Sequence, residues 1–451
     1  MKTYADLGER IQVRGERSRT KVVSGILTVI AILAVLAPMG NVPGEAVDQA
    51  AQGLLQALEQ DREILVAARI AGDIPLDPGA AAWHKAQPLA VPTYPQVTTA
   101  PMERRPQVAR VHLRALYNDR DIGFLLEWDD PSPDLTENSS QAFRDAVALQ
   151  FPIRYGEGIP LPYIGMGQKG QAVNIWHWKA SWQADLDRGF VDVEDAHPGM
   201  VSDLYPFAPP TPAAVPRTAT YDKTFLTGWG AGNPLSDPLR KSPVENLFAE
   251  GFGTLTSAGH SALEGRGLWQ GGLWQVAVKR AMKTDAPAEV QFSPAGGLFP
   301  VAIAVWQGGA GQVNGQKALS AWHFVAFEGV TPPVAYLRQL LWAPPIRGNV
   351  KAGAELMRTL ECYACHVWPG APQAGEIGPE LTYVGGIHRP QYLLEAVKAP
   401  DAHVVPSEHY MDRTGRTKMP EYDPDTLASA PGVTDPEQAY YDIVEFLRTL
   451  K

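Results

Sequence analysis

The sequence predicts a multidomain protein with an N-terminal transmembrane helix, an antiparallel β-sandwich and a small all-α domain at the C-terminus. Three observations support this fold class. A basic leader precedes an almost unbroken apolar run at residues 22–37. Short runs of alternating polar and apolar residues, separated by Gly- and Pro-rich turns, fill the middle of the 451-residue chain. Apolar residues with helical spacing recur near the C-terminus.

The first 40 residues have the pattern of a membrane anchor. The leader, residues 1–21, carries six Lys and Arg residues against three acidic ones, and residues 22–40 contain the apolar run. By the positive-inside rule, the N-terminus would stay in the cytoplasm and the bulk of the chain would lie on the periplasmic or outer side of the cell membrane. A cleaved signal peptide is the alternative, because the run is shorter than the about 20 residues of a full span. The long leader, and Pro38 directly after Ala37, favour an uncleaved single-pass anchor.

Residues 41–75 are expected to form an amphipathic helix and a linker. Apolar residues recur about every 3.6 positions from residue 45 to about residue 70, which is the pattern of a helix with one buried face. Its expected role is structural, as a stalk or as a packing helix near the membrane surface. Residues 73–101 are rich in proline and alanine, have no clear period and are expected to be extended.

A β-sandwich domain is predicted for residues 76–335. Two alternating runs flank the turn residues Asn118, Asp119 and Arg120 and predict a hairpin. Together with later runs they predict strands at 111–117, 122–128, 146–152, 172–178, 273–280, 299–306 and 321–327. Short strands separated by Gly and Pro loops are typical of an antiparallel sandwich. The proline-dense stretch 205–243 is expected to be an ordered functional loop, because passive loops of this length are uncommon in compact domains.

The two cysteines of the chain belong to one motif, Cys362-Tyr-Ala-Cys365-His366. This C-x-x-C-H spacing is the attachment signature of one covalent haem c. Both thiols can add to vinyl groups of the same porphyrin, and His366 can bind the iron as proximal ligand. A structural zinc site would need four protein ligands, and there is no further cysteine to supply them. Because c-type haem is attached outside the cytoplasmic membrane, the motif agrees with the predicted export of the chain.

Residues 347–451 resemble a class I cytochrome c in the order of their motifs. Helical patterns at 350–360, 390–398 and 435–451 surround the haem motif. The turn at 377–381 corresponds to the segment that lines the proximal side of the haem in such proteins. A small helical cytochrome c domain is therefore expected, with a methionine well downstream of the motif as the distal iron ligand.

Met419 is the expected distal ligand of haem c, because Thr-Lys-Met-Pro has the Met-Pro context usual in class I cytochromes. Met411 is the runner-up, and His403 and His409 are further competitors. The choice matters, since His/Met ligation gives a higher reduction potential than His/His ligation.

Four phrases of the middle region resemble the haem-binding gamma subunit of ethylbenzene dehydrogenase: LLEWDDPSPD (125–134), PYIGMGQKGQAVNIWHWKASW (162–182), ENLFAEGFGTLT (245–256) and AVWQGGAGQVNGQKALSAW (304–322). Related subunits serve selenate, chlorate and dimethyl sulfide enzymes and nitrite oxidoreductase, which are molybdenum enzymes of the dimethyl sulfoxide reductase superfamily. The resemblance covers roughly residues 76–330. It implies a β-sandwich that holds one noncovalent haem b, with Met166 and Lys317 as the axial ligands of its iron.

The residues themselves leave other ligands of haem b open. Without the resemblance, a lone methionine is usually a core residue, and a lysine in a Gly/Asn/Gln loop is usually solvated. His177 and His323, each beside tryptophan on a predicted strand, are rival ligands, core histidines or propionate partners, and Lys179 and Lys169 are weaker rivals. Arg280 is a candidate partner for a propionate of haem b, although an exposed strand arginine is the simpler interpretation.

Other chemistry is not indicated by the sequence. The net charge of −10 argues against nonspecific nucleic-acid binding. The chain contains no phosphate loop, nucleophile elbow or H-E-x-x-H motif. The pairs Asp129/Asp130 and Asp185/Asp187 are interpreted as turn and cap residues rather than calcium ligands, since no full ligand set surrounds them in the sequence. A subunit without substrate chemistry of its own is therefore expected.

The function predicted by these features is electron transfer by a membrane-anchored dihaem cytochrome. The resemblance implies a subunit of a respiratory molybdoenzyme complex, such as nitrate reductase or a related oxidoanion oxidoreductase, and the fused layout is similar to the cytochrome c subunit of respiratory nitrate reductases. Its expected partners are molybdopterin and iron–sulfur subunits, together with a quinol-oxidising membrane subunit or a soluble cytochrome. Two alternatives are a haem-based sensor or catalytic haem protein, and a carbohydrate-binding β-sandwich tethered to a monohaem cytochrome c.

Overall fold

The computed structural model describes residues 44–60, 63–105, 107–191, 197, 199, 227–258, 262–373, 375–402, 404–405 and 409–451. The predicted leader and membrane anchor at residues 1–40 therefore lie outside the described residues, as do residues 205–226 of the proline-dense stretch. Within the described ranges, no helix is both long and apolar enough to cross a membrane.

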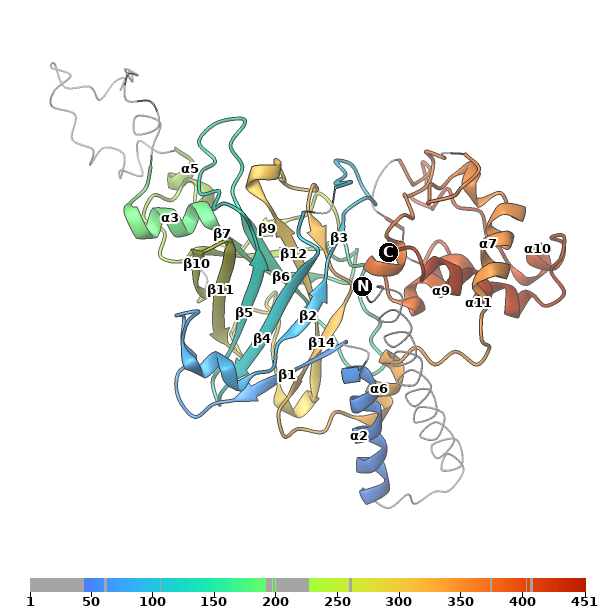
Figure 1. Cartoon of the computed structure of the whole chain (residues 1–451), viewed down its shortest axis with the longest axis horizontal. Helices are drawn as coiled ribbons and strands as arrows, with labels where there is room; N and C mark the ends of the chain where they lie inside the picture. Colours follow the sequence, from blue (N-terminus) through green and yellow to red (C-terminus); the bar gives the residue numbers. More distant parts are fainter. Residues whose placement is uncertain are drawn as a thin grey trace, which may run out of the picture.

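A large β-sheet domain is followed by a C-terminal helical region, as Figure 1 shows. The strands are β1 (Ile64–Arg69), β2 (Leu89–Pro92), β3 (Tyr94–Pro95), β4 (Arg110–Tyr117), β5 (Asp121–Asp129), β6 (Ala146–Pro152), β7 (Val173–Lys179), β8 (Val244–Ala249), β9 (Thr256–Ser257), β10 (Glu264–Gln270), β11 (Leu273–Ala281), β12 (Leu298–Trp306), β13 (Ala318–Leu319) and β14 (His323–Phe327). The helices are α2 (Gly44–Gln60), α3 (Ala180–Arg188), α5 (Thr227–Gly230), α6 (Val334–Leu340), α7 (Val350–Thr359), α8 (Val384–Ile387), α9 (Pro390–Lys398), α10 (Pro424–Ala428) and α11 (Pro436–Leu447). The seven predicted strands coincide with β4–β7, β11, β12 and β14 to within two residues at each end.

The described strands form one continuous sheet, with the main order β10-β11-β5-β4-β1-β14-β12-β6-β7-β8-β9. The sheet folds over, so that side chains of β4, β5 and β11 face those of β6, β7 and β12 across one core. Aromatic rings fill this core. The ring centroids of Phe124 and Phe151 are 5.7 Å apart, and those of Trp128 and Trp178 are 6.3 Å apart. Two packed layers of sheet leave one outer face of β6, β7, β8 and β12 available for a site.

Strand β1 corrects two predictions. Helix α2 ends at Gln60 and residues 64–69 form a strand, so the amphipathic helix does not reach residue 70. The strand begins Ile-Leu-Val-Ala-Ala and is buried on both faces, so its sequence lacks the alternation that distinguishes a strand from the end of a helix. β1 pairs in parallel with both β4 and β14, and the sheet is therefore mixed rather than purely antiparallel.

Helix α2 is a packing helix. Its residues Leu54 and Leu58 are buried together with Tyr336 and Leu337 of α6. The apolar stripe that predicts this helix is thus covered by another element of the same chain, and Figure 1 shows the two helices side by side.

The helical region contains the three predicted helices as α7, α9 and α11. Helix α7 begins after Asn349, whose side chain accepts hydrogen bonds from the backbone N–H groups of Lys351 and Ala352. Helix α11 crosses α7 closely at Gly353, where an added Cβ atom would lie 1.9 Å from the carbonyl oxygen of Asp442. This contact requires glycine, and it holds the first and last helices together as the class I cytochrome pattern predicts.

Polar contacts join the helical region to the β domain. The guanidinium of Arg389 pairs with Glu63 at 3.1 Å and donates to the carbonyl oxygen of Trp322 at 3.4 Å. The hydroxyl of Tyr410 donates to the carbonyl oxygen of Thr98 at 2.7 Å. Arg389 is buried, so these contacts belong to a closed interface rather than to a solvated linker.

Candidate functional site

The C-x-x-C-H motif follows helix α7, in a short 3-10 turn at Cys362–Ala364. The backbone N–H of His366 donates to the carbonyl oxygen of Cys362 at 2.9 Å, which closes one turn of chain. Both cysteines and the histidine line one cavity, and neither cysteine forms a disulfide. Burial raises the pKa of the Cys362 thiol to about 11, so that without a bound group this thiol is protonated at neutral pH. This donor set fits a covalent haem c.

The imidazole of His366 is oriented to bind iron through Nε2. Its Nδ1 lies 2.7 Å from the carbonyl oxygen of Pro379. Because a carbonyl oxygen can only accept, Nδ1 carries the proton and Nε2 carries the free lone pair. Burial also lowers the pKa of His366, which favours the neutral form that acts as a ligand. The turn at 377–381 lines this cavity, as predicted.

Gly378 packs against the ring of His366, and its replacement by alanine is expected to displace that ring. A Cβ atom at residue 378 would lie 2.5 Å from Cε1 and 2.7 Å from Nδ1 of His366. Overpacking of this kind costs about 1–3 kcal/mol. Gly378→Ala should lower the midpoint of thermal unfolding and shift the absorption spectrum of haem c. Gly72→Ala is the control, because nothing lies within 4 Å of its added Cβ, and equal behaviour of the two variants would contradict the close packing.

Met419 is the predicted distal ligand that reaches this cavity. It lines the cavity together with His366, whereas Met411 and His409 do not. His403, the remaining competitor, lies outside the described residues. An imidazole and a thioether at one cavity form the donor set of a His/Met haem.

A second cavity lies on the outer face of β6, β7, β8 and β12. Strands β6 and β12 are paired so that Ala148 lies opposite Ala304. The floor of the cavity is formed mainly by small side chains of these two strands, Ala146, Ala148, Ala302 and Ala304. Small residues leave free space above a sheet, and an apolar concave surface with a few polar groups is typical of a cofactor site. A flat porphyrin fits a floor of this kind.

Met166 lines the second cavity from the loop between β6 and β7. Its φ angle is 67°, in the left-handed region that non-glycine residues seldom adopt. Two backbone hydrogen bonds fix this loop. The N–H of Gly251 donates to the carbonyl oxygen of Met166 at 2.8 Å, and the N–H of Gly167 donates to the carbonyl oxygen of Tyr163 at 3.0 Å. A strained backbone that its neighbours hold in place is frequent at ligand-binding positions.

Lys317 lines the same cavity from the turn before β13. Its Nζ forms no hydrogen bond or ion pair with the part of the chain that the structure describes, and it lies 5.0 Å from the ring centroid of Trp306. Burial lowers the pKa of Lys317 to about 8. Lysine binds iron only as the neutral amine, and the lowered pKa shifts the side chain toward that form. The structure thus brings Met166 and Lys317 to one cavity.

His177 is the rival ligand that also lines this cavity. Its ring stacks on Trp306 with 4.8 Å between centroids, and its buried Nε2 has no hydrogen-bond partner among the described residues. Burial, and then the positive charges of Lys179, Arg144 and Lys317, hold the pKa of His177 well below its usual range. A neutral imidazole nitrogen therefore lies at the same cavity as the amine of Lys317.

The other rivals do not line this cavity. Lys179 is buried in an ion pair with Glu245, which occupies its amine. His323 donates from Nδ1 to the carbonyl oxygen of Ala321 at 3.0 Å, outside the cavity. Lys169 is exposed to solvent.

Arg280 is not brought to the second cavity. Its guanidinium is buried in the aromatic core, 5.0 Å from the ring centroid of Trp176, and is paired with Glu289 at 3.0 Å. Arg144 lines the cavity instead, paired with Glu137, and its buried Nε has no hydrogen-bond partner among the described residues. A guanidinium with an unused donor at a cavity wall suits an anionic group such as a propionate.

The two cavities share a wall. Thr98 and Ile387 line both of them, so a single layer of side chains separates the cavities there. Aromatic rings continue the contact between the two domains. His388 stacks on Tyr392 with 4.1 Å between centroids, and Tyr163 of the second cavity lies 5.6 Å from His388.

Sequence reasoning missed several residues of these cavities, namely Arg144, Thr98, Ile387 and His388. They lie in loops or in the short helix α8, outside any recognised motif. Each reaches its cavity because elements far apart in the sequence meet there, and a single sequence carries no local signal of such a meeting. His388 had a weak signal, as an isolated histidine directly before a helix-starting Arg-Pro pair.

The fold and the two cavities define a two-domain electron-transfer haem protein, with a noncovalent site on a β-sheet and a covalent site in a helical domain. Residues 80–318 match the family described as Ethylbenzene dehydrogenase, and residues 350–451 match Cytochrome c. The first match covers more than half of the chain, and the chain belongs to the ethylbenzene dehydrogenase family. Its cofactors are accordingly a covalent haem c and a noncovalent haem b.

Relatives in other organisms carry related names. A protein of Haloferax mediterranei named as a respiratory nitrate reductase haem subunit is 23% identical over 280 residues, which cover 62% of this chain and 78% of the relative. The gamma subunit of chlorate reductase from Ideonella dechloratans is 26% identical over 238 residues, which cover 51% of this chain and 87% of the relative. Among solved structures, a family 9 carbohydrate-binding module of Caldicellulosiruptor kristjanssonii in complex with glucose overlaps 59% of this chain and 96% of its own, at 8% identity. Its TM-score of 0.28 is too low to establish a shared fold.

Proposed function

We propose that this chain is the membrane-anchored dihaem electron-transfer subunit of a respiratory molybdoenzyme complex, such as a nitrate reductase or a related oxidoanion oxidoreductase. The names of the two relatives support the class of complex. Electron transfer within the chain is supported by one observation: Thr98 and Ile387 line both cavities and form a wall between them. Two haems on either side of one layer of side chains can exchange electrons without any substrate chemistry.

On the haem c side, four residues would hold the cofactor, and each has a different role. Cys362 and Cys365 would form the two thioether bonds, and His366 and Met419 would be the axial ligands. The hydrogen bond from Nδ1 of His366 to Pro379 keeps the imidazole in one tautomer and one orientation. Bound haem would supply one-electron transfer.

On the haem b side, Met166 and Lys317 would be the axial ligands, and Arg144 would neutralise a propionate. The cavity contributes by keeping the amine of Lys317 in an environment that lowers its pKa to about 8, so that its deprotonation for iron binding costs less free energy than it would for a solvated lysine. The alanine floor would leave room for the flat porphyrin above the sheet. A neutral thioether ligand tends to raise the reduction potential of a haem.

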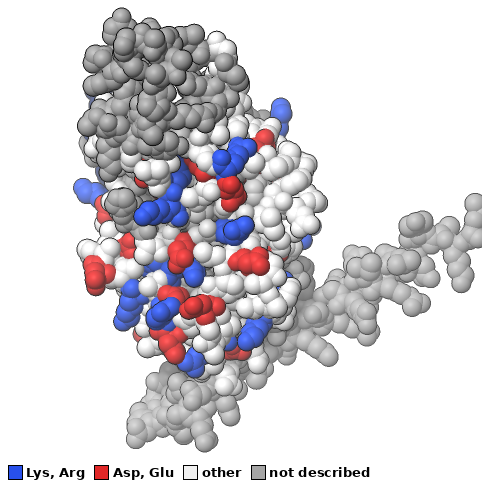
Figure 2. All heavy atoms as spheres, turned by 90° about the vertical axis from the view of Figure 1, so that its left-hand side faces the viewer, with Lys and Arg blue, Asp and Glu red and all other residues white. Residues whose placement is uncertain are grey.

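The proposed partners are molybdopterin and iron–sulfur subunits, and a quinol-oxidising membrane subunit or a soluble cytochrome. Although the net charge is −10, Figure 2 shows Lys and Arg interspersed with Asp and Glu on the face that lies at the left of Figure 1. A partner on that face would not be attracted by a field of one sign. At the haem c cavity, the lining residue Ile377 is 49% exposed, and a small apolar contact of this kind suits a transient redox partner.

The test uses the full chain with its haems bound. A pyridine haemochrome assay should give one haem b and one haem c per chain, and the reduced protein should not bind carbon monoxide. After rapid one-electron reduction, electrons should redistribute between the haems at a rate that is independent of protein concentration, because both haems belong to one chain. Co-purification with a molybdopterin subunit from the native membrane would identify the complex.

Each alternative function gives a different result. Carbon monoxide binding to one haem of the intact protein would favour a sensor or a catalytic haem protein. Haem c without haem b would favour a carbohydrate-binding sandwich tethered to a monohaem cytochrome. A redistribution rate that rises with protein concentration would show that the two haems do not communicate within the chain, and it would refute the proposed route through the shared wall.

A further inference from the structure

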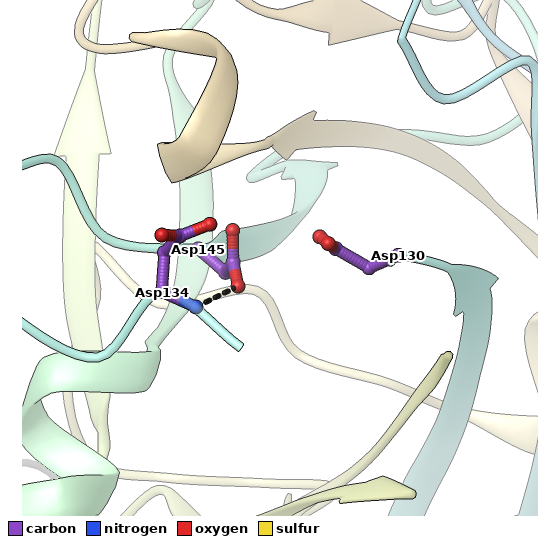
Figure 3. A group of neighbouring side chains, drawn as sticks. All are labelled: Asp130, Asp134 and Asp145. Carbon is purple, nitrogen blue, oxygen red and sulfur yellow. Dashed lines mark hydrogen bonds between the residues drawn. The ribbon is translucent and has the colours of Figure 1, made fainter. Parts of the chain in front are cut away.

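We propose that Asp130, Asp134 and Asp145 bind a calcium ion next to the haem b cavity. One carboxylate oxygen from each of the three residues lies within 4.8 Å of the others. Asp130 directly follows strand β5, and Asp145 directly precedes strand β6. Figure 3 shows the carboxylate of Asp130 pointing toward those of Asp134 and Asp145. The neighbouring Asp129 is exposed and does not belong to the group.

Two of the three carboxylates, those of Asp130 and Asp145, are buried, and Asp134 is half-buried. Asp130 is 1% exposed and Asp145 is 0% exposed. In the described part of the chain, no Lys, Arg or His forms an ion pair with any of the three. One oxygen of Asp130, Oδ2, is buried and receives no hydrogen bond from an N–H or hydroxyl group of the described residues. Its nearest polar neighbour is the carboxyl group of Asp145. A buried anion without a partner is strongly unfavourable, so this group is incomplete as described.

Backbone and side-chain donors hold the carboxylates in place but do not neutralise them. The three carboxylates accept hydrogen bonds from six N–H groups. Four are backbone groups, of Ser132, Asp134, Gly308 and Gly309, and two are side-chain groups, of Trp274 and Gln307. An ionised carboxylate has about four acceptor positions, so each of the three keeps capacity for a further ligand. The N–H donors fix the directions of the carboxylates and leave their negative charge for a cation.

A calcium ion matches this donor set. All donors are hard oxygen atoms, which excludes the softer transition metals that prefer nitrogen and sulfur. Calcium accepts oxygen ligands at about 2.3–2.6 Å in flexible geometry, whereas magnesium demands a tighter octahedron at about 2.0–2.1 Å. Oxygen atoms up to 4.8 Å apart can lie on opposite sides of a calcium ion at its usual distances. The competing solution is a shared proton, since burial and then the nearby Asp130 raise the pKa of Asp145 to about 7.

The consequence would be a fastened loop at the haem b cavity. Asp134 and Asp145 bracket residues 135–144, which contribute Glu137, Phe143 and Arg144 to the cavity lining. The two ends of this loop are already joined by two hydrogen bonds. The backbone N–H of Asp145 donates to the carbonyl oxygen of Asp134 at 2.9 Å, and the backbone N–H of Asp134 donates to Oδ2 of Asp145 at 2.7 Å. A cation between them would lock the loop. This consequence for haem b rests on the proposed function, whereas calcium binding by the three carboxylates is independent of it.

The experiment titrates calcium chloride into the full holoprotein after chelator treatment and gel filtration, using isothermal titration calorimetry. We expect one site per chain with a dissociation constant of roughly 10⁻⁶–10⁻³ M. Free calcium at about one hundred times that constant should raise the unfolding midpoint by on the order of 5 °C. Asp130→Asn should weaken calcium binding at least about tenfold, because it removes one charge from a nearly unchanged shape. Asp129→Asn is the matched control and should bind calcium like the parent.

Haem content, measured on each variant before titration, shows whether the fold is intact. If Asp130→Asn loses its haems, Asp134→Asn replaces it, because Asp134 is less buried. Absence of calcium binding by the parent protein overturns the proposal and leaves the shared proton. Tighter binding of magnesium than of calcium, or undiminished calcium binding by the Asp130 and Asp134 variants, overturns it as well. Faster loss of haem b on chelation, with haem c unchanged, would connect the ion to the cavity loop.

Discussion

Replacement of Met166 by glycine is expected to remove or retune haem b and to leave haem c unchanged. Glycine is the suitable replacement, because it accepts the left-handed backbone of this position, where φ is 67°, without strain. The variant should therefore keep the loop and lose only the thioether. Without that ligand the iron either leaves or binds an external molecule. We expect a fall in the ratio of haem b to haem c in the pyridine haemochrome assay, or new carbon monoxide binding by the haem b that remains.

Lys317→Ala removes the other proposed ligand and is likewise expected to remove or retune haem b while haem c stays unchanged. Where haem b is retained, its reduction potential should change on the order of 0.1 V, a fraction of the roughly 0.8 V that axial ligands span. The change is measured by redox titration of the haem b absorption band. Loss of a buried amine with a lowered pKa should also stabilise the haem-free β domain, because the amine no longer has to be desolvated.

Two controls separate the ligands from their neighbours. His177→Ala removes the rival nitrogen at the same cavity and should leave the coordination of haem b intact. Lys169→Ala removes an exposed lysine of the Met166 loop and should change nothing. A loss of haem b in His177→Ala, together with normal haem b in Lys317→Ala, would reassign the nitrogen ligand to His177.

The strands that the sequence predicts are those that combine strand-forming residues with clear turn signals at their ends. Hairpin β4–β5 and strands β6 and β12 carry clear runs of strand-forming residues between turns. Strand β8 contains Glu245 and Asn246, which are both buried, so its polar residues do not mark an exposed face. Strand β10 contains two glycines that lie against other side chains. In both strands burial is decided by tertiary contacts, and the local pattern cannot reveal it.

The two cofactor sites differ in the same way. The two proposed thioether cysteines and the proposed proximal ligand of haem c all lie within residues 362–366, so a local motif is sufficient to predict them. Met166 and Lys317 are far apart in the sequence and share no local pattern, and only the family resemblance placed them together before the structure did. The shared wall needs residues from both domains, and neither the motif nor the resemblance covers it. Arg280 shows the converse error, because a plausible strand arginine proved to be paired inside the core.

Replacement of both Cys362 and Cys365 by serine is expected to abolish covalent haem c and to destabilise the helical region. The cavity that haem c fills measures about 180 Å³ and is lined by core residues of three helices, among them Met357, Leu393 and Leu447. At roughly 24 cal/mol per Å³, an unfilled cavity of this size costs up to about 4 kcal/mol. A domain of this length is stable by only about 5–15 kcal/mol. A substantial part of that stability would therefore be lost with the cofactor.

The measurement is limited proteolysis followed by mass spectrometry, together with helical circular dichroism. Cleavage should become rapid within residues 350–451, and the helical signal should fall. Haem b should remain, because its alanine floor and both proposed ligands belong to the β domain. Met411→Leu is the control, since Met411 does not line the cavity. A protease-resistant helical region in the double serine variant would mean that packing of α7 against α11 at Gly353 is sufficient without haem. Simultaneous loss of haem b would instead mean that Ile387, through the shared wall, is required to close the haem b cavity.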